Sequence, residues 1–202
     1  MTTFVRAAGT RLACAVMLGL ASVSCGDMAR EGQASSYLIM TSLLGSRGGA
    51  TPGPFGGNLL SDVDPVFNDN GQAELTLAMK DPGSVQSPSA PTSANFITVE
   101  RYHVTYIRSD GHNIEGVDVP YAFDGAVTGT ISTQPATLSF TLVRHQAKEE
   151  APLRTLRTDA FLGIIISTIA EVTFYGHDQT GREVSVSGKI SITFADFANA
   201  TT

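Results

Sequence analysis

The sequence predicts an all-β protein, an antiparallel β-sandwich of about seven strands that follows a removable N-terminal leader. Short segments with alternating apolar and polar residues recur from Gln72 to the C-terminus, and such alternation buries one face of a strand. Segments rich in Gly, Pro, Ser and Asp separate them and predict turns. Only 16% of the residues are charged and Trp is absent, which is unlike a helical bundle or a disordered acidic tail. A barrel of about eight strands is the competing architecture.

Residues 1–24 have the pattern of a secretory signal peptide. Arg6 and Arg11 lie in an N-terminal part without acidic residues, and an apolar run over residues 12–23 follows. The run is about a dozen residues long, whereas a helix that spans a bilayer needs about 20. We therefore expect the leader to direct export and then to be removed.

The leader ends at Leu20-Ala21-Ser22-Val23-Ser24-Cys25. This junction resembles the lipobox of bacterial lipoprotein precursors, although Ser22 stands where that family usually has Leu. The resemblance implies that Cys25 is acylated and becomes the new N-terminus, and two or more acyl chains give stable membrane attachment. Ordinary cleavage after Ser24 is the alternative and would release a soluble periplasmic or secreted protein.

The resemblance also implies a location and a partner. A lipoprotein of this kind lies in the bacterial cell envelope and has the membrane as its partner, through the lipid on Cys25. In that family an acidic residue just after the cysteine can retain the protein in the inner membrane, but Asp27 lies one position too late. We therefore expect the outer membrane, with the domain facing the periplasm or the cell surface.

The mature chain is expected to contain a flexible tether and one domain. Residues 25–36 are small and polar and predict the tether, and residues 37–202 predict a single β-sandwich domain. Within it, residues 45–58 contain six glycines and two prolines and predict a long loop. Because both cysteines, Cys14 and Cys25, precede this domain, its stability must come from an apolar core rather than from disulfides.

The alternation of apolar residues predicts where the strands lie. Residues 148–159 hold much of the local charge and predict a short helix or a crossing loop, and residues 161–170 are apolar but too short to span a membrane, which favours a buried strand. The predicted strands cover residues 36–44, 72–79, 96–108, 126–132, 137–144, 161–175 and 183–194.

The last two predicted strands form the clearest pair and predict a β-hairpin. Val184, Val186 and Ile190 share one face of the second strand, and the connection contains Asp178-Gln179-Thr180-Gly181. This arrangement resembles the closing strands of bacterial immunoglobulin-like and fibronectin type III-like domains, in which an Asp-x-x-Gly turn recurs. The resemblance implies an immunoglobulin-like fold and no particular activity.

The sequence contains no motif for catalysis. None of the four histidines has a second metal-type ligand at helical or hairpin spacing, and neither Gly-x-Ser-x-Gly nor Ser-x-x-Lys occurs; the histidines are His103, His112, His145 and His177. We therefore predict a protein that is not an enzyme and that needs no cofactor. An enzyme whose site is dispersed along the sequence is an alternative.

One oxygen-rich segment, residues 61–71, is a candidate for calcium. Calcium favours several carboxylate and amide oxygens, and the candidates are Asp62, Asp64, Asn68 and Asp69. Their spacing is not that of an EF-hand loop, and Pro65 interrupts it. We therefore predict no resident metal.

A second segment, residues 117–125, combines aromatic and acidic residues and contains the binding candidates Tyr121, Phe123 and Asp124. It can be an exposed recognition loop. The preferred interpretation is that Tyr121 and Phe123 cover the core at a sheet edge, with Pro120 preventing further strand pairing.

Charge and pattern together favour binding as the function. The net charge is -6 and becomes more negative once the two arginines of the leader are removed, which excludes nucleic acid as a favoured partner. We expect a non-enzymatic envelope lipoprotein whose domain binds another protein or a surface polymer. The alternatives are a small-ligand carrier with a barrel or cleft and the dispersed-site enzyme.

Overall fold

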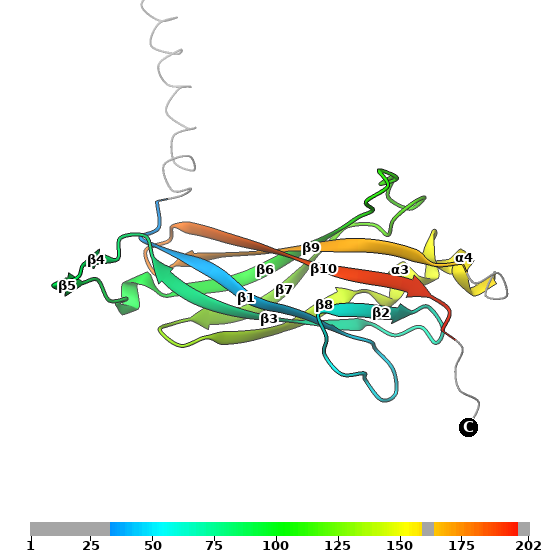
Figure 1. The fold of residues 1–202 in the computed structure, drawn as a ribbon, viewed down its shortest axis with the longest axis horizontal. Helices are drawn as coiled ribbons and strands as arrows, with labels where there is room; N and C mark the ends of the chain where they lie inside the picture. Colours follow the sequence, from blue (N-terminus) through cyan, green and yellow to red (C-terminus); the bar gives the residue numbers. More distant parts are fainter. Residues whose placement is uncertain (1–32, 159–163, 198–202) are drawn as a thin grey trace, which may run out of the picture.

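Two β-sheets packed face to face form most of the structure, a computed structural model that describes residues 33–158 and 164–197 (Figure 1). The predicted leader, Cys25, most of the predicted tether and residues 161–163 lie outside the described residues. Within these two ranges no helix is long and apolar enough to cross a membrane.

The first sheet has three antiparallel strands in the order β1-β3-β8. In β3 and β8 inward apolar residues alternate with outward polar residues, as the sequence predicts, whereas β1 exposes Tyr37 and Ile39. The strands are β1 (Ser36–Ser46), β3 (Asp69–Met79) and β8 (Ala136–Val143).

The second sheet has five strands in the order β2-β10-β9-β6-β7. All neighbours are antiparallel except β2 and β10, which run parallel. The strands are β2 (Asn58–Asp62), β6 (Ile97–Ile107), β7 (Phe123–Ile131), β9 (Ile166–Asp178) and β10 (Glu183–Ala195).

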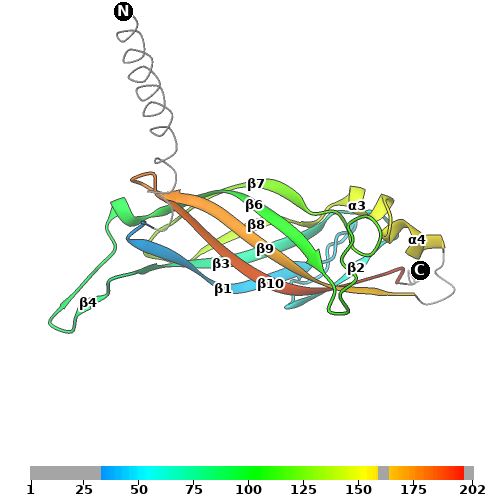
Figure 2. The same cartoon turned by 90° about the horizontal axis from the view of Figure 1, so that it is seen from above.

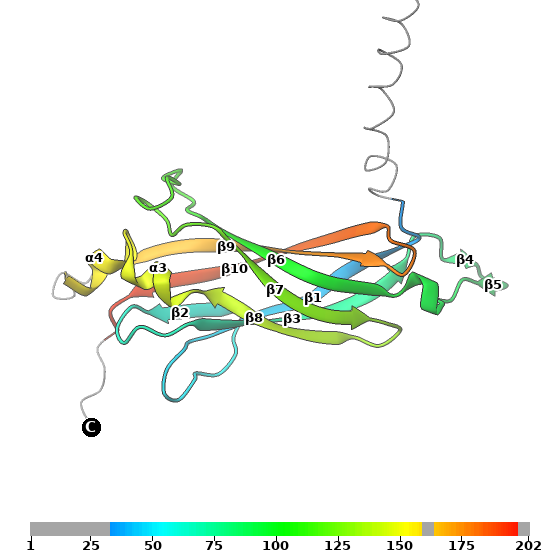
Figure 3. The ribbon, with the colours of Figure 1, turned by 180° about the vertical axis from the view of Figure 1, so that it is seen from behind.

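Short elements lie at the two ends of the sandwich. A small hairpin projects beside the start of β1, and two short helices lie at the opposite end (Figure 3). The elements are β4 (Gly83–Ser84), β5 (Ser87–Pro88), the 3-10 helix η1 (Ser93–Asn95), α3 (His145–Glu149) and α4 (Leu153–Thr158).

The strand order is that of an immunoglobulin-like sandwich, which confirms the predicted fold class. In the first sheet β1, β3 and β8 take the places of strands A, B and E, and in the second sheet β7, β6, β9 and β10 take those of C′, C, F and G. The parallel partner of β10, β2, was not predicted. The pairing of β2 with β10 joins residues more than 130 positions apart, for example Asn58 and Ser191, so no local sequence pattern predicts it.

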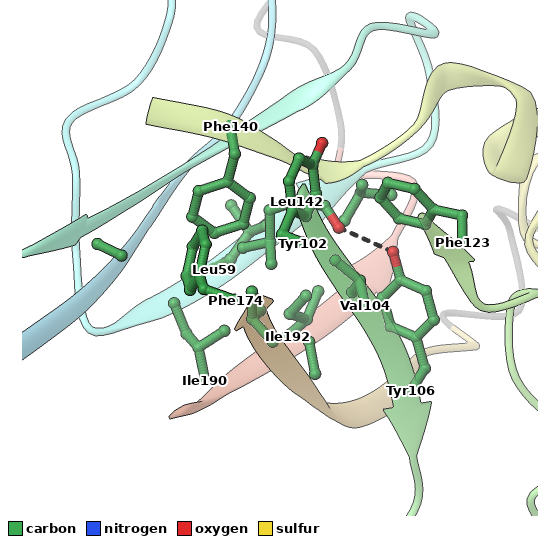
Figure 4. Close-up of a cluster of buried hydrophobic side chains, with 14 of the residues drawn as sticks. Leu59, Tyr102, Val104, Tyr106, Phe123, Phe140, Leu142, Phe174, Ile190 and Ile192 are labelled. Carbon is green, nitrogen blue, oxygen red and sulfur yellow. Dashed lines mark hydrogen bonds between the residues drawn. The ribbon is translucent and has the colours of Figure 1, made fainter. Parts of the chain in front are cut away.

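An aromatic cluster fills the space between the sheets (Figure 4). The ring of Phe140 lies 5.0 Å from that of Tyr102 and 5.2 Å from that of Phe174, measured between centroids. Nearby, the hydroxyl of Tyr106 donates a hydrogen bond to the carbonyl of Leu142 at 2.8 Å, and burial raises the pKa of this phenol. The buried hydroxyl is thus satisfied, as a core requires.

The predicted strands are confirmed, with several differences at their limits. β3 and β7 each begin three residues before the predicted start, at Asp69 and Phe123. The predicted loop at residues 45–58 is shorter, because β1 runs to Ser46 and β2 begins at Asn58. The predicted buried strand from residue 161 is wrong at its start, because β9 begins at Ile166 and both Ile164 and Ile165 are exposed. The terminal hairpin is confirmed, since β9 and β10 pair in register from Ile166 with Phe194 to His177 with Glu183.

Candidate functional site

A groove of about 580 Å³ opens at the end of the sandwich where the described chain begins. Figure 2 shows the start of β1 beside the β9–β10 turn at this end. The walls of the groove come from β1, the end of β3, β6 and the β9–β10 hairpin, and the side chains that matter for its chemistry are Tyr37, Lys80, Glu100, Arg101, Tyr175 and His177.

A β-bulge places two of these side chains on the same face. The pairing of β6 with β7 and with β9 shifts register between Val99 and Arg101, and both Glu100 and Arg101 are exposed. In a regular strand successive residues point to opposite faces, so the extra residue of the bulge is what brings both charges outward.

Gly176 on β9 accommodates the bulge. A Cβ atom at this position would lie 2.1 Å from the carbonyl oxygen of Thr98, which is far inside van der Waals contact. The backbones of β6 and β9 therefore approach each other here as only glycine allows.

Arg101 is the central cation of the groove. Its guanidinium carbon lies 3.8 Å from the centroid of the Tyr175 ring, a cation–π contact, and its Nη1 lies 3.5 Å from Oδ1 of Asp124. On the same side, Nδ1 of His177 lies 3.7 Å from Oε1 of Glu100. Tyr37 adds a ring that is 41% exposed.

This set of side chains suits a polar ligand that has flat apolar faces. Exposed aromatic rings pack on such faces while their hydroxyls form hydrogen bonds. The arginine supplies charge-assisted bonds to carboxylate or phosphate groups, and the carboxylates accept bonds from hydroxyls.

The Asp178 turn fixes the wall that carries Tyr175 and His177. Oδ1 of Asp178 accepts hydrogen bonds from the Thr180 hydroxyl at 2.6 Å, the Thr180 N–H at 2.8 Å and the Arg182 N–H at 3.0 Å. Gly181 completes the turn with a φ of +81°, in the left-handed region that glycine adopts without cost. Burial acts to raise the pKa of Asp178, but the bonds from Thr180 and Arg182 outweigh it and hold this pKa below its ordinary value.

The calcium candidates do not converge on one cation. Asp62 accepts the backbone N–H groups of Asp64 and Phe197, each at 3.3 Å, and lies 3.5 Å from Nη1 of Arg47; Asp64 is exposed. Burial raises the pKa of Asp62 despite these partners. Within the described residues no group of three or more His, Cys, Asp or Glu side chains is arranged to hold a metal ion.

The other two calcium candidates contact α3 instead. Oδ1 of Asn68 accepts the backbone N–H of His145 at 2.7 Å, so it caps a helix whose own N-cap, Arg144, makes no side-chain cap. Oδ2 of Asp69 lies 2.9 Å from Nζ of Lys148, and both side chains are buried.

The binding candidates at residues 117–125 are separated by the structure. Phe123 is buried and packs edge to face on Tyr102 at 6.1 Å, as expected of a residue that covers the core. Tyr121 does not cover the core, because 47% of it is exposed. Asp124 lies on the outer face, where its Oδ1 contacts Nδ1 of His103 at 3.1 Å as well as Arg101, so it borders the groove.

A second exposed feature lies at the opposite end, where residues 108–122 form a projecting loop that we call the distal loop (Figure 1). Ile114 and Val117 are each 65% exposed. The loop is nevertheless ordered by its own bonds: the carbonyl of Ile114 accepts the Asp118 N–H at 2.8 Å, and Oδ2 of Asp118 accepts the Ile114 N–H at 3.0 Å.

The pairing of Arg101 with Tyr175 was not predicted from the sequence. Both residues lie on predicted strands, but their contact depends on the register of β6 against β9 and on the bulge. The one local signal is Gly176, because glycine inside a strand often marks a bulge or a close backbone approach.

Comparison with known proteins leaves the fold and the groove as the basis for any functional conclusion: no model of a known protein family matches the chain, and no curated protein matches it.

Proposed function

We propose that this chain is a non-enzymatic lipoprotein of the bacterial envelope that binds a surface polymer in the groove beside Tyr37, Arg101 and Tyr175. The position and chemistry of the groove carry the proposal. It is lined by Ala34 and Ser36, which end the predicted tether at residues 25–36 and are already buried in the fold.

Lipid on Cys25 would keep this groove close to a membrane. A fully extended chain spans at most about 3.6 Å per residue, so Cys25 and Ala34 cannot lie more than about 32 Å apart. The groove would therefore lie near the layer in which envelope polymers are attached or deposited. The distal loop lies at the other end of the sandwich.

The lining favours a saccharide chain with anionic substituents. Tyr37 offers a partly exposed ring, and Arg101 is already oriented by its contacts with Tyr175 and Asp124. Such preorganisation reduces the entropy lost on binding. The groove is open rather than enclosed by apolar residues, which suits one segment of a long polymer better than a small carried molecule.

Sedimentation with purified envelope polymers tests the proposal. The protein is mixed with peptidoglycan sacculi or with lipopolysaccharide, and the bound fraction is measured for wild type, Tyr37→Ala and Arg101→Ala. We expect binding to one polymer and about a tenfold loss in each variant, equivalent to about 1.4 kcal/mol.

Lys189→Ala is the matched control. Lys189 forms an ion pair with Glu171 at 3.4 Å on the outer face of the same sheet and does not line the groove. Its loss should leave binding unchanged. Failure to bind either polymer, or equal weakening by Lys189→Ala and Arg101→Ala, would refute the proposed function.

The lipid anchor is tested separately with Cys25→Ser. This variant should move from the membrane fraction to the soluble fraction, because the thiol that carries the lipid is absent. Unchanged fractionation would refute the anchor without affecting the polymer test.

Binding of a partner protein at the distal loop is the second candidate function. Its support is the exposure of Ile114 and Val117 on a loop held in place by hydrogen bonds, since exposed apolar groups on a rigid support are typical of protein contacts. Crosslinking in intact cells tests it: Ile114→Ser with Val117→Ser should abolish an adduct that Arg101→Ala retains. An adduct unchanged by the double variant would refute this role.

A further inference from the structure

An amine and a carboxylate are enclosed together at the end of the sandwich that carries the short helices. Lys148 on α3 is 1% exposed and Asp69 at the start of β3 is 0% exposed, and Nζ lies 2.9 Å from Oδ2 and 3.0 Å from Oδ1. A buried ion pair is a poor source of stability, because removal of two charges from water costs about as much as their attraction returns. The contact between Lys148 and Asp69 therefore raises the question of whether the amine and the carboxylate react with each other.

Each oxygen of Asp69 has its own hydrogen-bond donor besides Lys148. The backbone N–H of Gly48 donates to Oδ1 at 2.8 Å, and the hydroxyl of Ser61 donates to Oδ2 at 2.5 Å. A backbone N–H directed at a carboxyl oxygen stabilises negative charge that develops there during addition to the carbon. The Ser61 hydroxyl, which donates to Oδ2, can pass a proton to this oxygen when it leaves as water.

We propose that Lys148 and Asp69 condense to an intramolecular isopeptide bond, which joins α3 to the first residue of β3. The two residues are 79 positions apart, so the bond would close a large loop across the domain. A covalent link of this kind restricts the unfolded chain as a disulfide does, in a domain that has no cysteine.

The step balances with water as the only by-product. One proton passes from the Lys148 ammonium to Oδ2, which gives a neutral amine and a carboxylic acid. Nζ then attacks Cγ, the N–C bond forms, and the carbonyl π electrons move to Oδ1, where the Gly48 N–H meets them. A second proton passes from Nζ through the Ser61 hydroxyl to Oδ2; the Cγ–Oδ2 bond breaks, water leaves and the C=O bond re-forms.

The surroundings favour this reaction over a lasting ion pair. Two groups held in contact react as if at very high concentration. Burial lowers the pKa of Lys148, although Asp69 and, more weakly, Asp62 oppose this effect, so the neutral amine that attacks is easier to reach than in water. Exclusion of water from the site also disfavours hydrolysis of the amide once it has formed.

Peptide mapping of the full chain, purified under native conditions and then unfolded in guanidinium, tests the bond. Trypsin should release residues 48–80 linked to residues 145–154, with the mass of both peptides less one water, and cleavage after Lys148 should be blocked. Free peptides 48–80 and 145–148 in most molecules would overturn the proposal. The map does not depend on how the leader is processed.

Lys148→Arg and Asp69→Ala are the reference variants. Lys148→Arg keeps a cation but has no amine that can condense, so it should release free peptide 48–80. In Asp69→Ala trypsin should cleave after Lys148 as at any lysine. A linked peptide 48–80 that persists in Lys148→Arg would place the bond at another lysine and refute the assignment.

Discussion

Asp178→Ala is the perturbation with the most direct structural basis. Oδ1 of Asp178 accepts three hydrogen bonds from the turn that follows it, and Oδ2 is buried with no hydrogen-bond partner among the described residues. Removal of Oδ1 leaves two backbone N–H groups and one hydroxyl without this acceptor. At about 1 kcal/mol for each bond in a turn that water can partly reach, the loss is about 3 kcal/mol at neutral pH.

Chemical unfolding followed by circular dichroism measures this loss in free energy. In thermal unfolding of a chain of this length, about 3 kcal/mol corresponds to a fall in Tm of about 6–12 °C. Asp178→Asn is the control, because an amide oxygen at the same position can accept all three bonds. We expect it to lose less stability than Asp178→Ala, because the only new cost is the amide nitrogen that replaces Oδ2.

The same pair of variants predicts a dependence on pH. The pKa of Asp178 is lowered in the folded state, so its contribution is fully present above the ordinary Asp pKa of about 3.9 and is lost as the pH falls through the folded value. The difference between wild type and Asp178→Ala should be constant at neutral pH and should shrink below about pH 4. A difference under about 0.5 kcal/mol at neutral pH, or Asp178→Asn as unstable as Asp178→Ala, would refute the hydrogen-bond account.

Three further predictions concern the groove, the core and the distal loop. Gly176→Ala should destabilise the fold by about 3 kcal/mol and weaken polymer binding, because the new Cβ would lie 2.1 Å from the Thr98 carbonyl oxygen. Thermal melts should show this loss of stability. An unchanged melting temperature would mean that the bulge relaxes freely. Phe174→Ala should lower the free energy of unfolding by about 4 kcal/mol, since the ring is fully buried between Tyr102 and Phe140. Chemical unfolding measures this loss, and a value below about 2 kcal/mol would contradict that packing. Hydrogen bonds from Arg108 and the His112 N–H lower the pKa of Asp110 to about 2. A carboxyl titration by NMR should find that midpoint in wild type and a higher one in Arg108→Ala, in which the His112 bond alone remains. An ordinary midpoint in wild type would contradict these hydrogen bonds.

Strands with one buried face were predictable because their signal is local. Leu75 and Leu77 on β3, or Val184 and Val186 on β10, alternate with polar residues whichever strand they pair with. The terminal hairpin was predictable for the same reason, since its Asp178–Gly181 turn lies between its two strands. The leader and the lipid on Cys25 are also local patterns, and they remain predictions.

The site was less predictable because its residues meet only through pairing. The segment at residues 61–71 was interpreted as a possible calcium loop, yet Asp69 contacts Lys148 and Asn68 caps α3, both from more than 70 positions away. In residues 117–125 Phe123 and Tyr121 looked alike, but one is buried and the other half exposed. The charge and type of a residue do not determine which distant side chain it contacts in the folded protein.

The sequence by itself determined that this is an all-β chain, where its main strands lie and that the last two strands form a hairpin. These features depend on alternation and on turn residues, which act over a few neighbouring positions. Only the tertiary structure decided that β2 joins β10 in parallel, that a bulge turns both Glu100 and Arg101 outward, and that Lys148 is enclosed with Asp69. These features depend on register and on packing between distant segments, which are settled when the two sheets bury their apolar faces together.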